Sequence, residues 1–132
     1  MSNEHLTLSS YTEDRGQGLL TGFQALARLP IAQVRTDRSG GYNTAAFVSG
    51  HAGPPLTGLG RELARAVEHV PDLPILFRPA VNEALAATSV MGSQLVAGQF
   101  DAKYEGVVGY WYGGAAGLAR AADSLRHANL VG

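Results

Sequence analysis

Three times along this chain, a short and uninterrupted apolar stretch leads through a turn rich in glycine or proline into a segment with helical periodicity. The apolar stretches are the expected strands Asn43–Gly50, Leu73–Phe77 and Tyr104–Tyr112. Because their apolar residues run continuously rather than alternating, we expect strands that are covered on both faces. Strands that alternate with helices predict an α/β fold, with a parallel sheet flanked by helices and right-handed crossovers.

Helix ends are marked by caps, glycines and prolines. The first helix is expected to begin at Gly18 or Thr21, to kink or break at Pro30, and to end at Ser39-Gly40-Gly41. Its apolar face comprises Leu19, Phe23, Leu26 and Leu29, and residues 31–38 are expected to form an exposed continuation. The later helices are expected over residues 59–70, 82–96 and 118–128.

The length of 132 residues predicts one domain with a substantial core. Residues 1–15 are expected to be a polar, peripheral N-terminal segment, and residues 16–132 a single α/β domain. The stretch after Ala128 is where a fourth strand would begin, so the sheet is expected to be incomplete at its C-terminal end. Three strands leave open edges, and either another chain completes the sheet or the domain is part of a longer protein.

Composition excludes several classes of function. A net charge of −1 gives no electrostatic case for binding nucleic acid or an anionic membrane. Without a long apolar run or an apolar leader, we expect neither a membrane span nor secretion, and therefore a cytoplasmic protein. The absence of cysteine removes disulfides, thiolate zinc sites and iron–sulfur ligation, and the four histidines lack metal-ligand spacing, so no metal site is expected.

Ligands of open α/β sheets bind at the carboxyl ends of the strands. In this chain those ends are the loops Gly50–Pro55, Arg78–Glu83 and Gly113–Gly117. Glycines in such loops let backbone amides approach an anion, although a tight strand-to-helix turn is the more common reason for them. The candidate residues of these loops and the helix that follows them are Gly50, Gly53 and Gly113 for a cofactor, and His51 and Arg120 for a substrate. His51 could donate a hydrogen bond or a proton, and Arg120 could face an anionic substrate or lie in solvent.

Glu83 is the candidate that carries most of the chemistry. It follows Asn82, a good N-cap, and a carboxylate in the first turn of a helix gains about 0.3–1 kcal/mol from the helix dipole. That capping role is sufficient by itself to explain the residue. A sharper role follows from its apolar neighbours, because a carboxyl group in an apolar pocket can exchange protons with a ligand. Those neighbours are Phe77, Pro79, Val81 and Leu85.

Five groups of residues, in order along the chain, together resemble the N-terminal region of indolepyruvate ferredoxin oxidoreductases. They are Leu20-Thr21-Gly22 with Gln24-Ala25-Leu26 and Arg28-Leu29-Pro30, Asn43-Thr44-Ala45, Val81-Asn82-Glu83 with Leu85-Ala86-Ala87-Thr88, Trp111-Tyr112-Gly113, and His127-Ala128-Asn129-Leu130. The resemblance covers roughly residues 11–132. These enzymes are thiamine-diphosphate-dependent 2-oxoacid:ferredoxin oxidoreductases, and the resemblance implies the pyrimidine-binding domain of the thiamine-diphosphate fold.

The resemblance implies a specific task for Glu83, which matches the glutamate that hydrogen-bonds the aminopyrimidine ring. Proton exchange between Glu83 and the ring nitrogen would activate the cofactor for attack on a 2-oxoacid, with electrons passing to iron–sulfur clusters and ferredoxin and the acyl group to coenzyme A. In such enzymes the cofactor supplies the hard chemistry and the protein tunes it. Asn82 and the loop glycines are then expected beside the cofactor, and Arg120 matches an arginine of the family.

The chain also departs from the family. Ala52-Gly53-Pro54-Pro55 stands where an Arg-Gly-Ser-Pro-like loop is expected, and Gly114-Ala115-Ala116-Gly117 where a Lys-Gly-Pro-Gly loop is expected. No Gly-Asp-Gly diphosphate motif and no cysteine are present. Diphosphate, Mg²⁺ and the iron–sulfur clusters would therefore be held by other domains or subunits of a homo- or hetero-oligomer. The alternatives are a catalytically degenerate structural or assembly module and, on the glycine loops alone, a generic phosphate- or nucleotide-binding domain.

Overall fold

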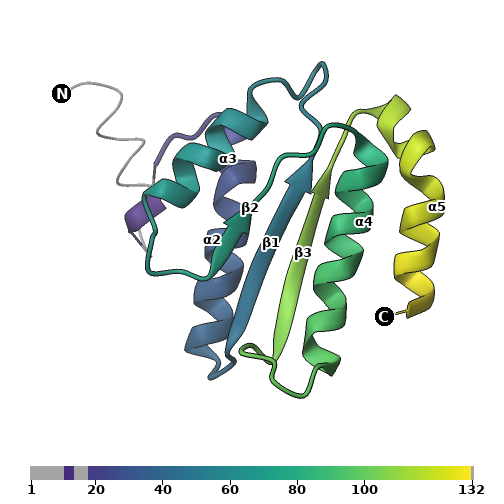
Figure 1. The fold of residues 1–132 in the computed structure, drawn as a ribbon. Helices are drawn as coiled ribbons and strands as arrows, with labels where there is room; N and C mark the ends of the chain where they lie inside the picture. Colours follow the sequence, from purple (N-terminus) through teal and green to yellow (C-terminus); the bar gives the residue numbers. More distant parts are fainter. Residues whose placement is uncertain (1–10, 14–17, 132) are drawn as a thin grey trace.

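A three-stranded parallel sheet with helices on both faces forms the centre of the computed structural model, which describes residues 11–13 and 18–131 (Figure 1). This confirms the expected α/β class. The elements, in chain order, are α2 (Gly22–Ser39), β1 (Thr44–Gly50), α3 (Leu59–Glu68), β2 (Ile75–Phe77), α4 (Glu83–Gln94), the short 3₁₀ helix η1 (Leu95–Gly98), β3 (Gly106–Tyr112) and α5 (Ala115–Val131).

The strands are ordered β2-β1-β3, and both pairings are parallel. Ala46 lies at the centre of the sheet, opposite Ile75 on one side and Val108 on the other. The central strand β1 is largely buried, as its continuous apolar run predicts. β3 is an edge strand, so one row of its backbone hydrogen-bonding groups faces away from β1. It contains no charged residue and no proline.

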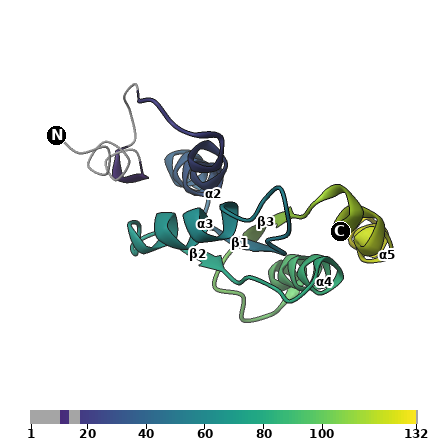
Figure 2. The same cartoon turned by 90° about the horizontal axis from the view of Figure 1, so that it is seen from above.

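The helices form layers on the two faces of the sheet, seen end-on in Figure 2. α2 and α3 pack together on one face, over β1 and β2, and α4 covers β1 and β3 on the other. α5 packs against α4 and forms the outer wall of the domain on that side (Figure 1). The strands all point towards the edge at which α4 and α5 begin, so the three predicted site loops share that edge.

α2 begins where the sequence predicts and continues where a break was expected. Thr21 and Gln24 form a capping box at its start. The Thr21 hydroxyl oxygen accepts the Gln24 N–H, and the Gln24 side-chain oxygen accepts the Thr21 N–H. The helix ends at Ser39, and Gly41 takes the positive φ of 86° that favours glycine. Pro30 does not interrupt the helix: it lies buried inside it. One helical hydrogen bond is lost there, and apolar burial on both sides of the proline keeps the helix continuous.

The buried face of α2 differs in part from the expected one, of which Phe23 does pack against the core. Ala27, Ile31 and Val34 are fully buried, whereas Leu26 and Leu29 are exposed. The expected exposed continuation after Pro30 therefore contributes two side chains, Ile31 and Val34, to the core, while its other residues are exposed or half-buried. Ala27, Ile31 and Val34 also have the spacing of one helix face, as the leucines do. This face was not predicted because alanine is a weaker hydrophobic signal than leucine.

Tyr11 lies in the segment expected to be peripheral, but its side chain is part of the core. It is fully buried within the core cluster, and its hydroxyl donates to the Glu62 carboxylate of α3. The adjoining backbone is tied to α2, because a guanidinium nitrogen of Arg35 lies 3.0 Å from the Thr12 carbonyl. The expected peripheral segment of residues 1–15 thus contributes a core side chain, and residues 1–10, 14 and 15 of this segment lie outside the described part.

The end of the chain also differs from expectation. No fourth strand begins after Ala128, because α5 continues to Val131. α5 also begins at Ala115, three residues earlier than expected, and its first turn is part of the site described below. None of the helices in the described part of the chain is long and apolar enough to cross a membrane.

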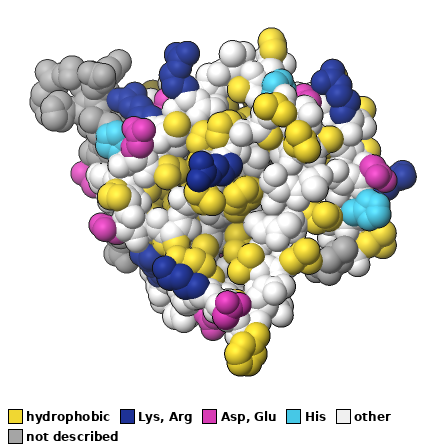
Figure 3. Space-filling model, viewed as in Figure 1, with side chains coloured by type: hydrophobic (Ala, Val, Ile, Leu, Met, Phe, Trp, Pro, Cys, Tyr) yellow, Lys and Arg dark blue, Asp and Glu magenta, His cyan; other side chains and the backbone are white. Residues whose placement is uncertain are grey.

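An apolar hollow of about 270 Å³ lies between α2, α3 and the end of β3. Its walls include Leu26, Leu29, Leu56 and Tyr110. On the face of the molecule shown in Figure 3, Lys and Arg side chains are dispersed among acidic and hydrophobic ones rather than gathered in one patch.

Candidate functional site

The three strand-end loops meet at one edge of the sheet, as the parallel topology predicts. The Ala80 N–H donates to the Gly50 carbonyl at 3.0 Å, which joins the loop after β2 to the end of β1. His51 Nδ1 lies 3.4 Å from the Ala80 carbonyl. A side chain added at Gly114 would come within 3.4 Å of the Pro54 carbonyl, so the loop after β3 lies against the loop after β1.

Glu83 lies where these loops converge, at the first residue of α4. Asn82 is the N-cap, and its side-chain oxygen accepts the Leu85 N–H at 2.8 Å, as expected from the sequence. Glu83 is 5% exposed. In the part of the chain that the structure describes, Glu83 and Ser49 are the two buried polar residues. Trp111 Nε1 donates to the Glu83 backbone carbonyl at 3.1 Å. The backbone of Glu83 is therefore fixed by the cap of its own helix and by the neighbouring strand.

The carboxylate of Glu83 is held by the start of α5. Arg120 Nη1 lies 3.3 Å from Glu83 Oε2, and the same contact is an ion pair and a hydrogen bond. Gly117 lies directly against the side chain, since an added Cβ would be only 2.4 Å from Glu83 Cγ and 2.6 Å from Oε1. At Gly113 an added Cβ would be 3.2 Å from Glu83 Cγ. Two glycines thus make the space that the carboxylate occupies.

The surroundings of the carboxylate differ from the apolar pocket that the sequence predicts. Val81 is 79% exposed, and Leu85 and Pro79 are also exposed, so they do not enclose Glu83. The residues before and after a helix start point in different directions, and only the carboxylate turns inward. Its neighbours include the backbone of two glycines and the guanidinium group of Arg120.

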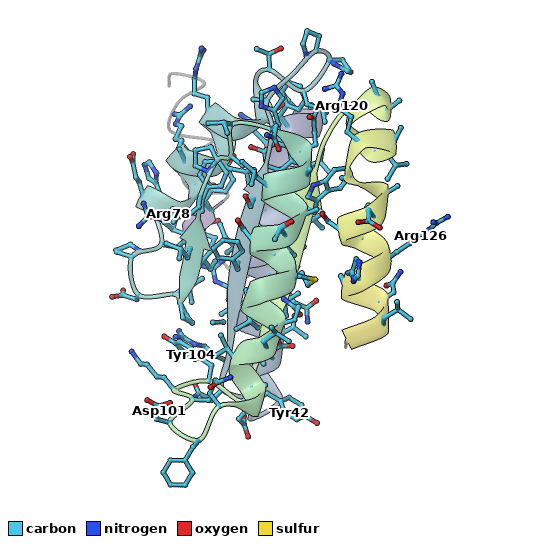
Figure 4. All side chains as sticks on the ribbon, turned by 45° about the vertical axis from the view of Figure 1, so that its right-hand side comes forward. Tyr42, Arg78, Asp101, Tyr104, Arg120 and Arg126 are labelled. Carbon is cyan, nitrogen blue, oxygen red and sulfur yellow. The ribbon has the colours of Figure 1, made fainter. Side chains whose placement is uncertain are left out.

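Arg120 bridges α5 and α4. Its side chain is 67% exposed, while that of Glu83 is 7% exposed, so the ion pair closes the site from the solvent side. In Figure 4, Arg120 lies at the start of α5 beside the start of α4, whereas Arg126 points outward from α5. The cation that the sequence assigns to a substrate is, in this structure, engaged by Glu83.

The candidate glycines Gly50 and Gly53 differ in how closely they are packed. At Gly50 an added Cβ would be 2.4 Å from both the ring and the carbonyl oxygen of Tyr112, so the end of β1 requires glycine. At Gly53 the nearest neighbour is the His51 ring at 3.7 Å, which leaves room. Burial raises the pKa of Tyr112, whose hydroxyl has no hydrogen-bond partner among the described residues.

Sequence reasoning missed Gly117 and Trp111 as parts of the site. Both contact Glu83 from elements that follow it by about thirty residues, so no local pattern connects them. The cluster of small residues Gly113–Gly117 was the available signal, because small residues between a strand and a helix permit another side chain to approach closely.

The arrangement provides one buried carboxylate at the positive end of a helix, with a single cation and backbone groups around it. Such a group can accept hydrogen bonds from a ligand or exchange a proton with it. The described residues contain no cluster of three histidine, aspartate or glutamate side chains that could hold a metal ion. Comparison with known proteins gave no match to a family model, to a curated protein or to a solved structure.

Proposed function

We propose that this chain is the pyrimidine-binding part of a thiamine-diphosphate-dependent 2-oxoacid oxidoreductase of the indolepyruvate type. In this role Glu83 binds the aminopyrimidine ring of the cofactor. The observation that supports the proposal most is the burial of Glu83 at the carboxyl edge of a parallel sheet, the edge where ligands of such sheets bind. A carboxylate is rarely buried unless it is paired, because desolvation disfavours its charged form, and the partner of Glu83 is a largely exposed arginine.

The described residues fit an aminopyrimidine ring in their chemistry. The ring offers a nitrogen that can share a proton with a carboxylate, and Glu83 offers that carboxylate on a fixed backbone. Asn82 and Trp111 hold that backbone in place. When bound, the cofactor supplies the carbon that attacks a 2-oxoacid, and Glu83 tunes it by holding or releasing a proton at the ring nitrogen.

The proposed role requires groups from outside this chain. A diphosphate-binding domain with Mg²⁺, iron–sulfur domains and ferredoxin would complete the enzyme, with a 2-oxoacid and coenzyme A as substrates in a cytoplasmic homo- or hetero-oligomer. Arg120 and His51 are the proposed contacts to the 2-oxoacid, and Gly53 and Gly113 the proposed contacts to the cofactor. Arg120 can take that role only after it leaves Glu83.

The test is binding of 4-amino-5-hydroxymethyl-2-methylpyrimidine, the pyrimidine half of the cofactor, to the 132-residue chain. Ligand-observed NMR suits the weak affinity expected for so small a molecule, on the order of 1 mM, or about −4 kcal/mol. We expect Glu83→Gln to abolish saturable binding, because the amide cannot hold the ring proton. Binding by Glu83→Gln that equals that of the unchanged chain would refute the assigned role.

Glu105→Gln is the matched control for this experiment. Glu105 precedes β3 at the opposite end of the sheet, where its carboxylate accepts the Asn43 N–H at 2.6 Å. The Glu105→Gln substitution removes the same charge from the chain as Glu83→Gln but does not alter the site. We expect its binding curve to overlie that of the unchanged chain.

One observation favours the second candidate function, a catalytically degenerate structural or assembly module. The Glu83 carboxylate already has a partner in Arg120, and an ion pair between a buried carboxylate and a largely exposed guanidinium group can serve to hold two helices together. In that case Glu83→Gln and Arg120→Gln would both destabilise the fold, and neither the unchanged chain nor its variants would bind the pyrimidine.

A further inference from the structure

The Glu83 carboxylate is enclosed, and this limits how any ligand can reach it. Gly117 lies against its Cγ and Oε1 positions, and Arg120 covers it from the solvent side. Both residues belong to the first two turns of α5. A planar ring that hydrogen-bonds Glu83 would have to occupy space that α5 now fills.

The fully buried residues of the helix pair α4 and α5 are small, and the larger side chains of Met91 and Leu125 are half-buried. The residues buried on α4 and α5, other than Glu83 itself, are Ala86, Ala87, Gly117 and Ala121. The larger Leu118 and Leu130 are mostly exposed. Separating α5 from α4 therefore uncovers no large, fully buried apolar side chain, and elements with few buried apolar contacts open most readily.

Two polar contacts fasten this weak interface. One is the Arg120–Glu83 ion pair, and the other joins the side-chain oxygens of Thr88 and Ser124 at 3.1 Å. The helix is connected to β3 by Gly113-Gly114, which lies outside regular structure and can serve as a hinge. α5 packs chiefly on α4, so it can move without disturbing the sheet.

We propose that α5 is a lid over Glu83, latched by Arg120, and that it swings about Gly113-Gly114 to admit a ligand to the carboxylate. The identity of that ligand, an aminopyrimidine, rests on the proposed function above. The movement does two things at once, because it uncovers the anion of Glu83 and frees the cation of Arg120. A ligand with a proton to share and an anionic group nearby can then satisfy both.

The rate at which Glu83 is modified tests the lid without any cofactor. Carbodiimide coupling with glycine ethyl ester, followed by peptide mass spectrometry, measures how often each carboxylate is accessible. We expect Glu83 to react about tenfold or more slowly than Glu105, since it reacts only when the lid is open. Arg120→Gln should raise the Glu83 rate several-fold, whereas the outward-pointing Arg126→Gln should leave it unchanged (Figure 4).

A reversible lock gives the decisive comparison. The chain contains no cysteine, so a Thr88→Cys, Ser124→Cys double variant carries one defined pair at a site where the native side-chain oxygens already touch. We expect oxidation to slow Glu83 modification about tenfold and reduction to restore it, with Glu105 unaffected throughout. Equal Glu83 rates in the oxidised and reduced protein would overturn the lid.

The same variant separates the failure of the lid from the failure of the proposed function. If the lid and the proposed function are both correct, the reduced protein binds the pyrimidine probe and the oxidised protein does not. If the reduced protein also fails to bind, the proposed function is wrong, while the modification rates still decide whether α5 is a lid. If the oxidised protein binds as well as the reduced protein, the lid does not control access and the inference fails.

Discussion

Replacement of Gly117 by alanine is the sharpest test of how Glu83 is packed. In an ordinary helix interior this change stabilises, since alanine exceeds glycine in helix propensity by about 1 kcal/mol. Here the added Cβ would lie 2.4 Å from Glu83 Cγ and 2.7 Å from Cδ. These are carbons of a buried side chain rather than the end of a flexible one. We therefore expect overpacking to cost about 2–3 kcal/mol, for a net loss of about 1–2 kcal/mol.

Gly92→Ala provides the matched control. Gly92 lies in α4, and an added Cβ there has no neighbour within 4 Å. The same chemical change should therefore stabilise the protein by about 0.5–1 kcal/mol. The two variants should differ by about 1.5–3 kcal/mol in the free energy of unfolding, and this difference reports the contact between residue 117 and Glu83.

Urea unfolding followed by fluorescence is a convenient assay, because Trp111 is the sole tryptophan and lies beside the site. Each kcal/mol should change Tm by about 3–4 °C in a domain of this size, so thermal unfolding gives a second measure. The slope of the urea transition should be the same for both variants if only the native contact changes. A Gly117→Ala protein as stable as Gly92→Ala would refute the packing of Glu83 beneath α5.

Three further predictions concern the residues around the sheet edge and the core. Asn82→Ala should cost about 1 kcal/mol in urea unfolding, and Asn82→Asp should retain most of that energy, because a carboxylate also caps the Leu85 N–H. Gly50→Ala should cost about 3 kcal/mol or prevent folding, as judged by circular dichroism, because its Cβ would collide with a backbone oxygen. Burial and the hydrogen bond to Glu62 raise the pKa of the Tyr11 hydroxyl. The contribution of Tyr11 to the free energy of unfolding is therefore constant below about pH 10. It falls as the pH rises further, because the Tyr11 hydroxyl then ionises in the unfolded chain but not in the folded one. Tyr11→Phe should therefore lower stability by about 1 kcal/mol at pH 8 and flatten its alkaline decline, measured by urea unfolding across pH 8 to 11.

The architecture could be predicted from the sequence because its signals are local. Continuous apolar runs such as that of β1 indicate buried strands, and the caps at Thr21 and Asn82 mark helix starts that the structure confirms. Parallel topology then places the three strand-end loops on one edge without further information. The position of Glu83 at that edge follows from these elements alone.

Pairings between distant segments could not be predicted in the same way. The choice between the two apolar faces of α2 depends on which one meets the sheet, and a count of large side chains favours the wrong one. The neighbours of the Glu83 carboxylate come from α5, where Gly117 and Arg120 follow it by more than thirty residues. Side chains near it in sequence, such as Val81, point to solvent because the chain turns sharply into the helix.

The buried position of Tyr11 has a practical consequence for any shortened version of this domain. A chain trimmed to begin at residue 16, where the polar composition ends, would lack this ring and leave a void against α3. Loss of a buried aromatic side chain typically costs about 3–5 kcal/mol, a large part of the stability of a domain this size. Expression boundaries, fusion partners and protease sites therefore belong before Tyr11.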